Sequence, residues 1–420
     1  MVVSAKLQLA VLAVVIVVVV GAVTVLPELG KSLSGDPDQP PAPAPTPDPT
    51  PTPDPVPDPT PTPDPQVPEY PEGIAFDAST GALIADAEID WVIEDQLYKH
   101  IDKVKEKKTG TKVVLPSGYY KVTAKGETFD VIVDGTVSKS AGWNYHYNGQ
   151  VFSISVTYEI DIRELAEIMM DNREWNNQRL EKKSFKLYEL PDKVYVGDTV
   201  MKLEKEMERI FVDELEGSLD DRQALADFLV SFAQLGIEYP HASYTWVDEK
   251  GKPVYEVING KSVPKKSTDY EVWGCVEYWA NSLETMFFGT GDCEDSSAVA
   301  CSILSAAGFR TAMAGLYGHV NAGVALDDFQ VRDLNDYDFL SVRNSMKEGY
   351  GPAVRSSDPT IYYGVETISG QAPVGYMISK YVDSVTEEGS TYVDLDYVQW
   401  FSGFYPVQGD VDGIHSSSKV

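Results

Sequence analysis

A run of prolines between residues 36 and 68 limits most strongly what this chain can fold into. Proline stands there at nearly every second position, as in PDPTPTPDPVPDPTPTPDP. Because proline has no backbone N–H and a fixed φ, such a tract forms neither helices nor strand ladders and favours extended polyproline II. At about 3.1 Å per residue, roughly thirty residues reach on the order of 100 Å. We therefore expect residues 36–68 to be a disordered linker, serving either as a stalk or as a plain spacer.

The segment before this linker has the length and composition of a membrane span. Residues 7–26 are almost wholly apolar (LQLAVLAVVIVVVVGAVTVL), enough to cross a hydrocarbon core of about 30 Å as a helix. Lys6 precedes the span, and no clear small-residue cleavage site follows it, which favours an uncleaved signal anchor over a removed signal peptide. We expect residues 1–35 to be a cytoplasmic stub and anchor of a single-pass cell-membrane protein whose remaining part is extracellular.

The net charge of the chain limits the kinds of molecule that it is expected to bind. Its 34 basic and 65 acidic residues give a formal net charge of −31, whereas nucleic acids and anionic headgroups attract clustered lysine and arginine. No nucleic-acid partner is therefore expected, and no pattern indicates an organic cofactor. No His and Cys spacing fits zinc, and the Asp-rich segments 333–338 and 410–413 lack EF-hand spacing. The sequence thus predicts neither a cofactor nor a metal site.

The part after the linker divides into three segments. Residues 69–142 alternate short strand-like runs with turns, and VVLPSGYYKVTAKGETFDVIVDG resembles the small carboxypeptidase-regulatory-like β-sandwich modules, which implies an accessory or spacer role. Residues 143–216 mix a strand-like run (150–158) with helical ones (165–170 and 200–211) and lead into residues 217–420. A helix whose entry lies over residues 218–222 and which ends near Gly236 opens that last segment, because Leu225, Phe228, Leu229 and Phe232 form one apolar stripe.

The block Gly291-Asp292-Cys293-Glu294-Asp295 places a thiol at a predicted helix start. Asp292 fits the N-cap and Asp295 the N3 position of a capping box, and the helix pattern runs to Gly308. A helix N-terminus favours thiolate at Cys293, but the three neighbouring carboxylates oppose it. Activation of this thiol must therefore depend on a partner, and His319 on the following strand-like segment can be that partner.

Two further cysteines, Cys275 and Cys301, are predicted to be small buried apolar residues, with a disulfide between them as the alternative. Another strand-like segment, residues 361–367, brings Glu366 as a carboxylate for His319. Nucleophile, base and orienting acid are the groups that acyl transfer on cysteine requires.

These elements together resemble the transglutaminase-like superfamily of papain-fold cysteine enzymes, in particular its exported archaeal members. The resemblance spans roughly residues 220–375 and is carried by FAQLGIEY (232–239), EYW (277–279), LET (283–285), GTGDCED (289–295), GF (308–309), GHV (318–320) and YGVET (363–367). It implies an α+β catalytic domain over residues 217–420, with the cysteine helix packed on an antiparallel sheet.

The resemblance also implies a triad in which Cys293 is the nucleophile, His319 the general base and acid, and Glu366 the orienter. Members of the family often carry aspartate in the third place, and an insertion-like segment over residues 329–359 separates the histidine from Glu366. Three aspartates remain rivals for the third role: Asp327, Asp328 and Asp333.

An oxyanion hole needs donors aimed at the tetrahedral oxygen. The backbone N–H of Cys293 is the natural first donor, and the side chain of Trp279 or Tyr278 is a candidate for the second, with core or wall packing as the alternative for both. Trp273 and Tyr317 are candidates for lining the cleft.

The resulting hypothesis is a membrane-anchored extracellular cysteine protease or amidase that acts on a protein or peptide, such as a cell-envelope protein. Hydrolysis and amine transfer use the same groups, so a protein cross-linker is an alternative, and the resemblance favours hydrolysis. A non-catalytic binding or adhesion module that keeps the fold is a second alternative, and a purely structural envelope protein is a third.

Overall fold

The computed structural model describes residues 70–98, 105–182, 185–239, 255–258, 261–264, 269–274, 277–316, 319–330, 347–350, 360, 362–368, 370–379, 383–387, 390–394 and 405–407. The expected anchor and proline-rich linker lie outside these residues, as do Cys275, Tyr317, Asp333 and the two Asp-rich segments. Within the described ranges, no helix combines the length and the apolar character needed to cross a membrane.

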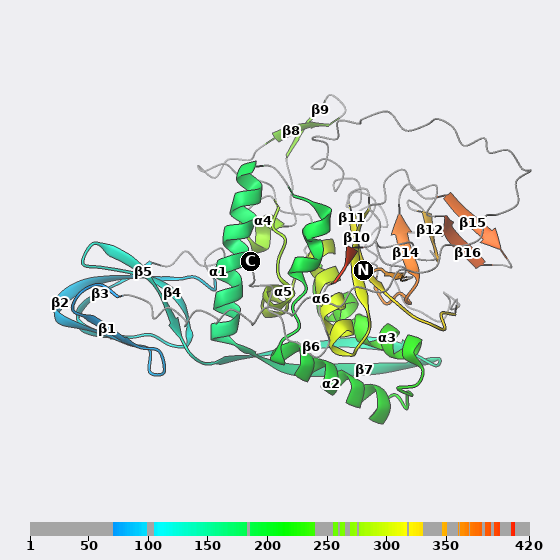
Figure 1. Cartoon of the computed structure of the whole chain (residues 1–420), viewed down its shortest axis with the longest axis horizontal. Helices are drawn as coiled ribbons and strands as arrows, with labels where there is room; N and C mark the ends of the chain where they lie inside the picture. The colour runs from blue at the N-terminus through cyan, green and yellow to red at the C-terminus, as the bar shows by residue number, and fades with distance from the viewer. Residues whose placement is uncertain are drawn as a thin grey trace, which may run out of the picture.

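The described chain is a mixed α+β structure built on antiparallel sheets, as the sequence predicts at this level (Figure 1). One sheet lies at one end of the molecule, a small sheet lies at the other, and helices surround a third sheet between them. Within these sheets, every described strand pair is antiparallel except β12 with β16. In an antiparallel pair the end of one strand lies beside the start of the next, so residues from both can meet at one edge of the sheet.

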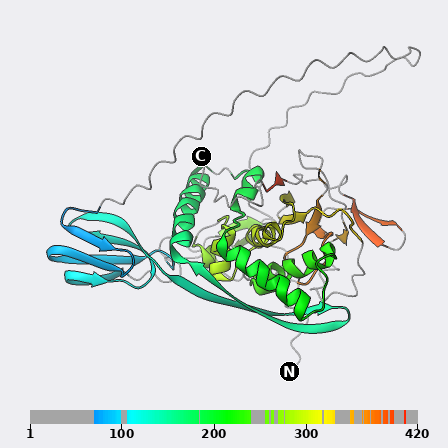
Figure 2. The same ribbon diagram turned by 60° about the horizontal axis from the view of Figure 1, so that its bottom comes forward.

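The first sheet confirms strands within residues 69–142, but β2 and β3, with 14 and 10 residues, are longer than the predicted short runs. Hydrogen bonds join all five strands into one sheet that curls around its own core (Figure 2). Alternating side chains turn inward, so that Leu83, Trp91, Val122 and Val131 are fully buried. The strands are β1 (Ile74–Asp77), β2 (Ala82–Asp95), β3 (Lys105–Val114), β4 (Gly118–Ala124) and β5 (Glu127–Val133).

A long hairpin links this sheet to the larger core. Strands β6 (Thr136–Tyr147) and β7 (Gln150–Asp161) pair over their whole length and therefore cross residue 142, where the sequence places the end of the accessory module. Asn148 and Gly149 form the turn with φ of 49° and 73°, which the Asn-Gly dipeptide adopts readily. Every second side chain of β7, from Ile154 to Ile160, is buried. The hairpin itself runs beneath the helices (Figure 2).

The larger core forms around one buried helix, α6 (Cys293–Ala306). All its residues from Cys293 to Leu304 are buried, as expected for a helix packed on every side, and its many Ser and Ala residues allow close approach. The other helices of the described chain include those predicted over 165–170, over 200–211 and from an entry at 218–222 to Gly236. They are α1 (Ile162–Lys182), η2 (Leu187–Lys193), α2 (Asp198–Asp213), α3 (Arg222–Ser231), the π-helix η3 (Phe232–Gly236), α4 (Asp269–Val272) and α5 (Ser282–Phe288).

Helix α6 packs on a four-stranded sheet of order β13-β11-β10-β17. In its register Leu316 pairs with His319 and Ala322 pairs with Val365, so His319 begins β11 and Glu366 directly follows β13. The sheet therefore brings the predicted histidine and glutamate to one edge. Its strands are β10 (Thr311–Leu316), β11 (His319–Val324), β13 (Tyr363–Val365) and β17 (Tyr405–Pro406).

Two peripheral sheets complete the described structure. Strand β16 ends at Asp394, and residues 395–404 lie outside the described chain. The members are β8 (Tyr255–Ile258), β9 (Lys261–Pro264), β12 (Lys347–Tyr350), β14 (Tyr376–Ser379), β15 (Asp383–Glu387) and β16 (Ser390–Asp394).

Candidate active site

Cys293 is the first residue of α6 and is 8 % exposed. Gly291 before it is required by close approach, because a Cβ there would lie 2.6 Å from the Cβ of Asp295. Asp292 occupies the N-cap as predicted, but the prediction that its side chain caps the helix is wrong, since it makes no cap hydrogen bond. Asp295 instead accepts from the backbone N–H of Ala280 at 2.8 Å, which ties the preceding loop to the helix start.

His319 lies between the thiol and a buried carboxylate. Its Nε2 is 3.1 Å and 3.2 Å from the two carboxylate oxygens of Glu366. The His319 side chain also interacts with the Cys293 thiol, through a hydrogen bond that lowers the pKa of the thiol and raises the pKa of the imidazole. The structure thus brings together the three residues that the sequence predicts as a triad.

Four hydrogen-bond donors, in addition to the His319 imidazole, hold Glu366: three donate to its carboxylate and one to its backbone carbonyl. Asn321 Nδ2 donates to the carboxylate at 3.2 Å, and the backbone N–H groups of Thr367 and Ile368 donate to it at 2.9 Å and 3.1 Å. The side chain of Gln234, on the π-helix, donates to the backbone carbonyl of Glu366 at 2.8 Å. The carboxylate is therefore held in one orientation, which an orienting residue requires.

The loop after Glu366 is attached to the π-helix, to α3 and to β6. Gln234 also donates to the carbonyl of Ala372, and Asp227 on α3 accepts from the N–H of Val374. The side chain of Gln371 both accepts from the N–H and donates to the carbonyl of His146, each at 2.7 Å. Gln371 thereby pairs with β6 as a neighbouring strand would, and fixes the loop to the long hairpin.

The charges on the histidine and the glutamate support each other. Burial alone would lower the pKa of His319, but the Glu366 charge and the hydrogen bonds to Cys293 and Glu366 raise it well above its usual value. Burial alone would raise the pKa of Glu366, but the charge and hydrogen bond of His319 lower it. The hydrogen bonds from the Ile368 backbone and the Asn321 side chain lower it further. An imidazolium–carboxylate pair is therefore favoured at this position.

The thiol experiences opposing influences. Burial and then the Glu294 carboxyl raise the pKa of Cys293 well above its usual value, while the hydrogen bond and charge of His319 lower it. Sγ lies 3.1 Å from Oε2 of Glu294. Burial and four neighbouring acids in turn raise the pKa of Glu294, which favours its neutral form and weakens its repulsion of a thiolate.

The two candidate oxyanion side chains already have acceptors. The Tyr278 hydroxyl donates to Glu284 at 2.8 Å, and Trp279 Nε1 donates to Glu277 at 2.9 Å. Tyr278 also stacks on Trp273 with ring centroids 4.4 Å apart. Both residues therefore have the core or wall contacts that the sequence analysis weighed as their alternative.

The rival third residues take no described part in the site. Asp327 and Asp328 are exposed beyond the end of β11, whereas Glu366 is fully buried beside His319. Cys301 is a free, buried thiol that donates to the carbonyl of Ala312 at 3.3 Å, as expected for a small core residue.

Two supporting residues were not identified from the sequence. Asn321 stands two positions after His319, on the same face of β11, and this strand periodicity is the signal that could have found it. Gln234 gave no comparable signal, because its role depends on a contact 132 residues away.

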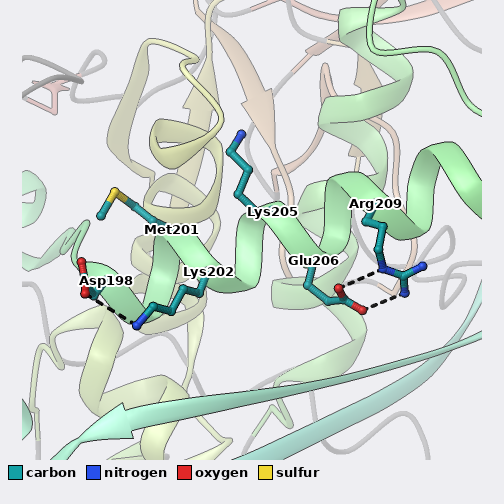
Figure 3. Close-up of a pocket in the computed structure, with 6 residues that line it drawn as sticks. All are labelled: Asp198, Met201, Lys202, Lys205, Glu206 and Arg209. Carbon is teal, nitrogen blue, oxygen red and sulfur yellow. Dashed lines mark hydrogen bonds and ion pairs between the residues drawn. The ribbon is translucent and has the colours of Figure 1, made fainter.

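The surface of α2 offers a shallow pocket that contains no triad residue (Figure 3). Its charged side chains pair with one another: Lys202 lies 3.6 Å from Asp198, and Arg209 lies 2.8 Å from Glu206. These exposed pairs satisfy their own charges, so the pocket adds nothing to the chemistry of the site.

No family model, curated protein or solved structure matches the chain. Any conclusion on its function therefore depends on the arrangement of Cys293, His319 and Glu366 and on the groups that hold them.

Proposed function

We propose that this chain is a cysteine enzyme that acts on peptide or carboxamide bonds through a thioester. The observation that supports this most directly is the position of His319, hydrogen-bonded to the Cys293 thiol and 3.1 Å from the buried Glu366 carboxylate. A nucleophile, a base and a group that orients the base are the minimum for this chemistry.

In the proposed reaction the Cys293 proton already resides on His319 as imidazolium, and the thiolate Sγ of this ion pair attacks the carbonyl carbon. The tetrahedral oxygen is stabilised by the backbone N–H of Cys293 at the helix N-terminus, where such groups have no partner within the helix. His319 then gives its proton to the leaving amine, and the C–N bond breaks to leave a thioester on Cys293. Water or a second amine, deprotonated by His319, attacks the thioester and restores the thiol.

We infer the fold family of the region around α6 from the same arrangement. A cysteine-bearing helix packed on an antiparallel sheet, with the histidine and the acid on neighbouring strands, supports a transglutaminase-like or papain-like catalytic domain. The resemblance to exported microbial members favours hydrolysis over amine transfer. The apolar residues 7–26 support a membrane-anchored protein with this domain outside the cell.

The test uses the full-length protein with a peptide library in water enriched in ¹⁸O. Hydrolysis places one ¹⁸O atom in each newly formed carboxylate, whereas amine transfer attaches an added labelled primary amine and leaves no such carboxylate. Cys293→Ala should abolish product formation, and Cys301→Ala, which removes the other described thiol, is the matched control. Product formation by Cys293→Ala at the wild-type rate would refute the proposal.

A second candidate is a binding module that keeps the fold without catalysis. The observation that favours it is the carboxylate-rich surroundings of Cys293, which raise the pKa of its thiol. If the chain is a binding module, Cys293→Ala should retain both ligand binding and the wild-type cellular phenotype. If it is an enzyme, Cys293→Ala should lose the wild-type phenotype.

A further inference from the structure

Three buried aspartates meet behind the nucleophile. Asp269 begins α4, Asp292 is the N-cap of α6, and Asp295 lies in its first turn. One carboxylate oxygen of each lies within 4.8 Å of those of the other two. Their exposures are 4 %, 8 % and 0 %, so these oxygens have little access to solvent.

One carboxylate of this group has an oxygen without any hydrogen-bond partner. Asp295 accepts from the Ala280 N–H through Oδ1, but its Oδ2 is fully buried and accepts from no group. Asp269 is held in place in a similar way, because its Oδ2 accepts from the N–H of Tyr278 at 2.7 Å. A buried carboxylate oxygen with no donor is costly, so the group needs either a proton or a cation there.

The charges around the three aspartates add to this need. Burial raises the pKa of Asp269 and of Asp295 well above the usual value, and the nearby carboxylates raise it further. Glu277 belongs to the same neighbourhood, where burial and the Asp292 charge raise its pKa to about 7. Among the described residues, neither Asp269 nor Asp295 has an ion pair with a lysine or an arginine.

We propose that Asp269, Asp292 and Asp295 bind one divalent cation, and that this cation is Ca²⁺. All three donors are carboxylate oxygens, which hard cations prefer. Ca²⁺ accepts irregular sets of mono- and bidentate carboxylates, whereas Mg²⁺ keeps several waters in an octahedral shell, for which a group this buried has less room. The bound ion ties the segment that begins at Asp269 to the start of the nucleophile helix.

The cation site does not depend on the cysteine chemistry, and its test reads binding alone. Full-length protein, stripped with a chelator, is titrated with CaCl₂ by calorimetry and then with Tb³⁺, whose emission nearby indoles sensitise. Trp273 is a suitable sensitiser because it follows Asp269 by one helical turn, with its backbone N–H donating to the backbone carbonyl of Asp269 at 2.7 Å. We expect one saturable Ca²⁺ per chain at this site, and sensitised Tb³⁺ emission that Ca²⁺ displaces and that Trp273→Phe reduces.

Variants locate the ion. Asp269→Asn and Asp295→Asn keep the side-chain size and should each weaken Ca²⁺ binding by about tenfold or more. Asp327→Asn, which removes an exposed acid, should bind as the wild type does. Wild-type Ca²⁺ affinity in both aspartate variants would overturn the site. Absence of sensitised Tb³⁺ emission from the wild-type protein would also overturn it, even if an aspartate variant fails to fold. Emission of the same strength from Trp273→Phe would overturn it as well.

One further outcome would overturn the assignment in favour of another metal. Asp292, Cys293 and Glu294 form a second group of possible ligands that includes a sulfur atom. Stoichiometric Zn²⁺ binding that blocks alkylation of Cys293, with no Ca²⁺ binding, would place the ion on the thiol instead.

Discussion

Replacing Glu366 by glutamine removes the negative charge beside His319 with little change in shape. The wild-type carboxylate accepts from the imidazole, from Asn321 and from two backbone N–H groups. A glutamine can still accept from some of these donors through its oxygen, but it leaves the imidazolium without its counter-charge. We therefore expect the variant to fold and its histidine to lose basicity.

The size of the effect follows from the hydrogen bond that is lost. A hydrogen bond to a charged group contributes about 1.5–3 kcal/mol, and about 1.4 kcal/mol corresponds to one pKa unit. The pKa of His319 should thus fall by roughly one to two units, and with it the population of the thiolate–imidazolium pair. We expect Glu366→Gln to slow alkylation of Cys293 at pH 7 by roughly tenfold to a hundredfold.

The assay is the pseudo-first-order rate of iodoacetamide labelling at Cys293, followed by mass spectrometry of its peptide. Asp327→Asn is the matched control, since it changes a rival acid to its amide at an exposed position. Thermal unfolding of each variant checks that the fold is intact. A Glu366→Gln rate equal to the wild type, or a larger loss in Asp327→Asn, would refute Glu366 as the orienting acid.

Three other substitutions test the surroundings of the site and the stability of the fold. Glu294→Gln should leave alkylation at pH 8 near the wild-type rate, because burial and the neighbouring acids already favour the neutral form of this carboxyl; an increase of about tenfold would mean that the carboxyl 3.1 Å from the thiol is charged and opposes its ionisation. Burial, followed by the neighbouring acid, raises the pKa of the fully buried Glu204 from 4.5 to about 7, so the folded state holds a proton that the unfolded state releases between these pH values. Glu204 should therefore contribute a loss of about 2–3 kcal/mol of stability as pH rises through this window, and Glu204→Gln should reduce the fall measured by urea unfolding by that amount; parallel curves for the two proteins would contradict it. Gln371→Ala should lower the free energy of unfolding by about 2 kcal/mol, because the N–H and carbonyl of His146 lose their partner, whereas Gln178→Ala on the exposed face of α1 should change it little.

Local patterns in the sequence were sufficient for most elements of the fold. The apolar alternation in β4 and β7 and the stripe in α3 each depend on residues close in sequence, so period and turn residues identify them. The hairpin across residue 142 was not anticipated as one unit, because an Asn-Gly turn and two long strands join what composition alone divides.

The site was predictable where its chemistry is local and not where it depends on distant contacts. Cys293 and His319 stand in short motifs, and Glu366 stands in a third. The cap role of Asp292 was wrong because its position near the other acids, and not the capping pattern, determines where its side chain lies. The approach of Asp269 to Asp295 could not be seen in the spacing, since a loop and a second helix separate them.

The attachment of Glu366 through Gln234 also determines when the site is completed as the chain folds. That contact joins residues 132 apart in sequence, and the one to Ala372 joins residues 138 apart. Contacts between distant residues form late, because the chain must first close a long loop, and a growing chain makes its N-terminal part first. A newly made or truncated chain that ends before Glu366 therefore has His319 without its orienting acid. We expect the proposed nucleophile, Cys293, to become fully reactive only after the whole domain has been synthesised.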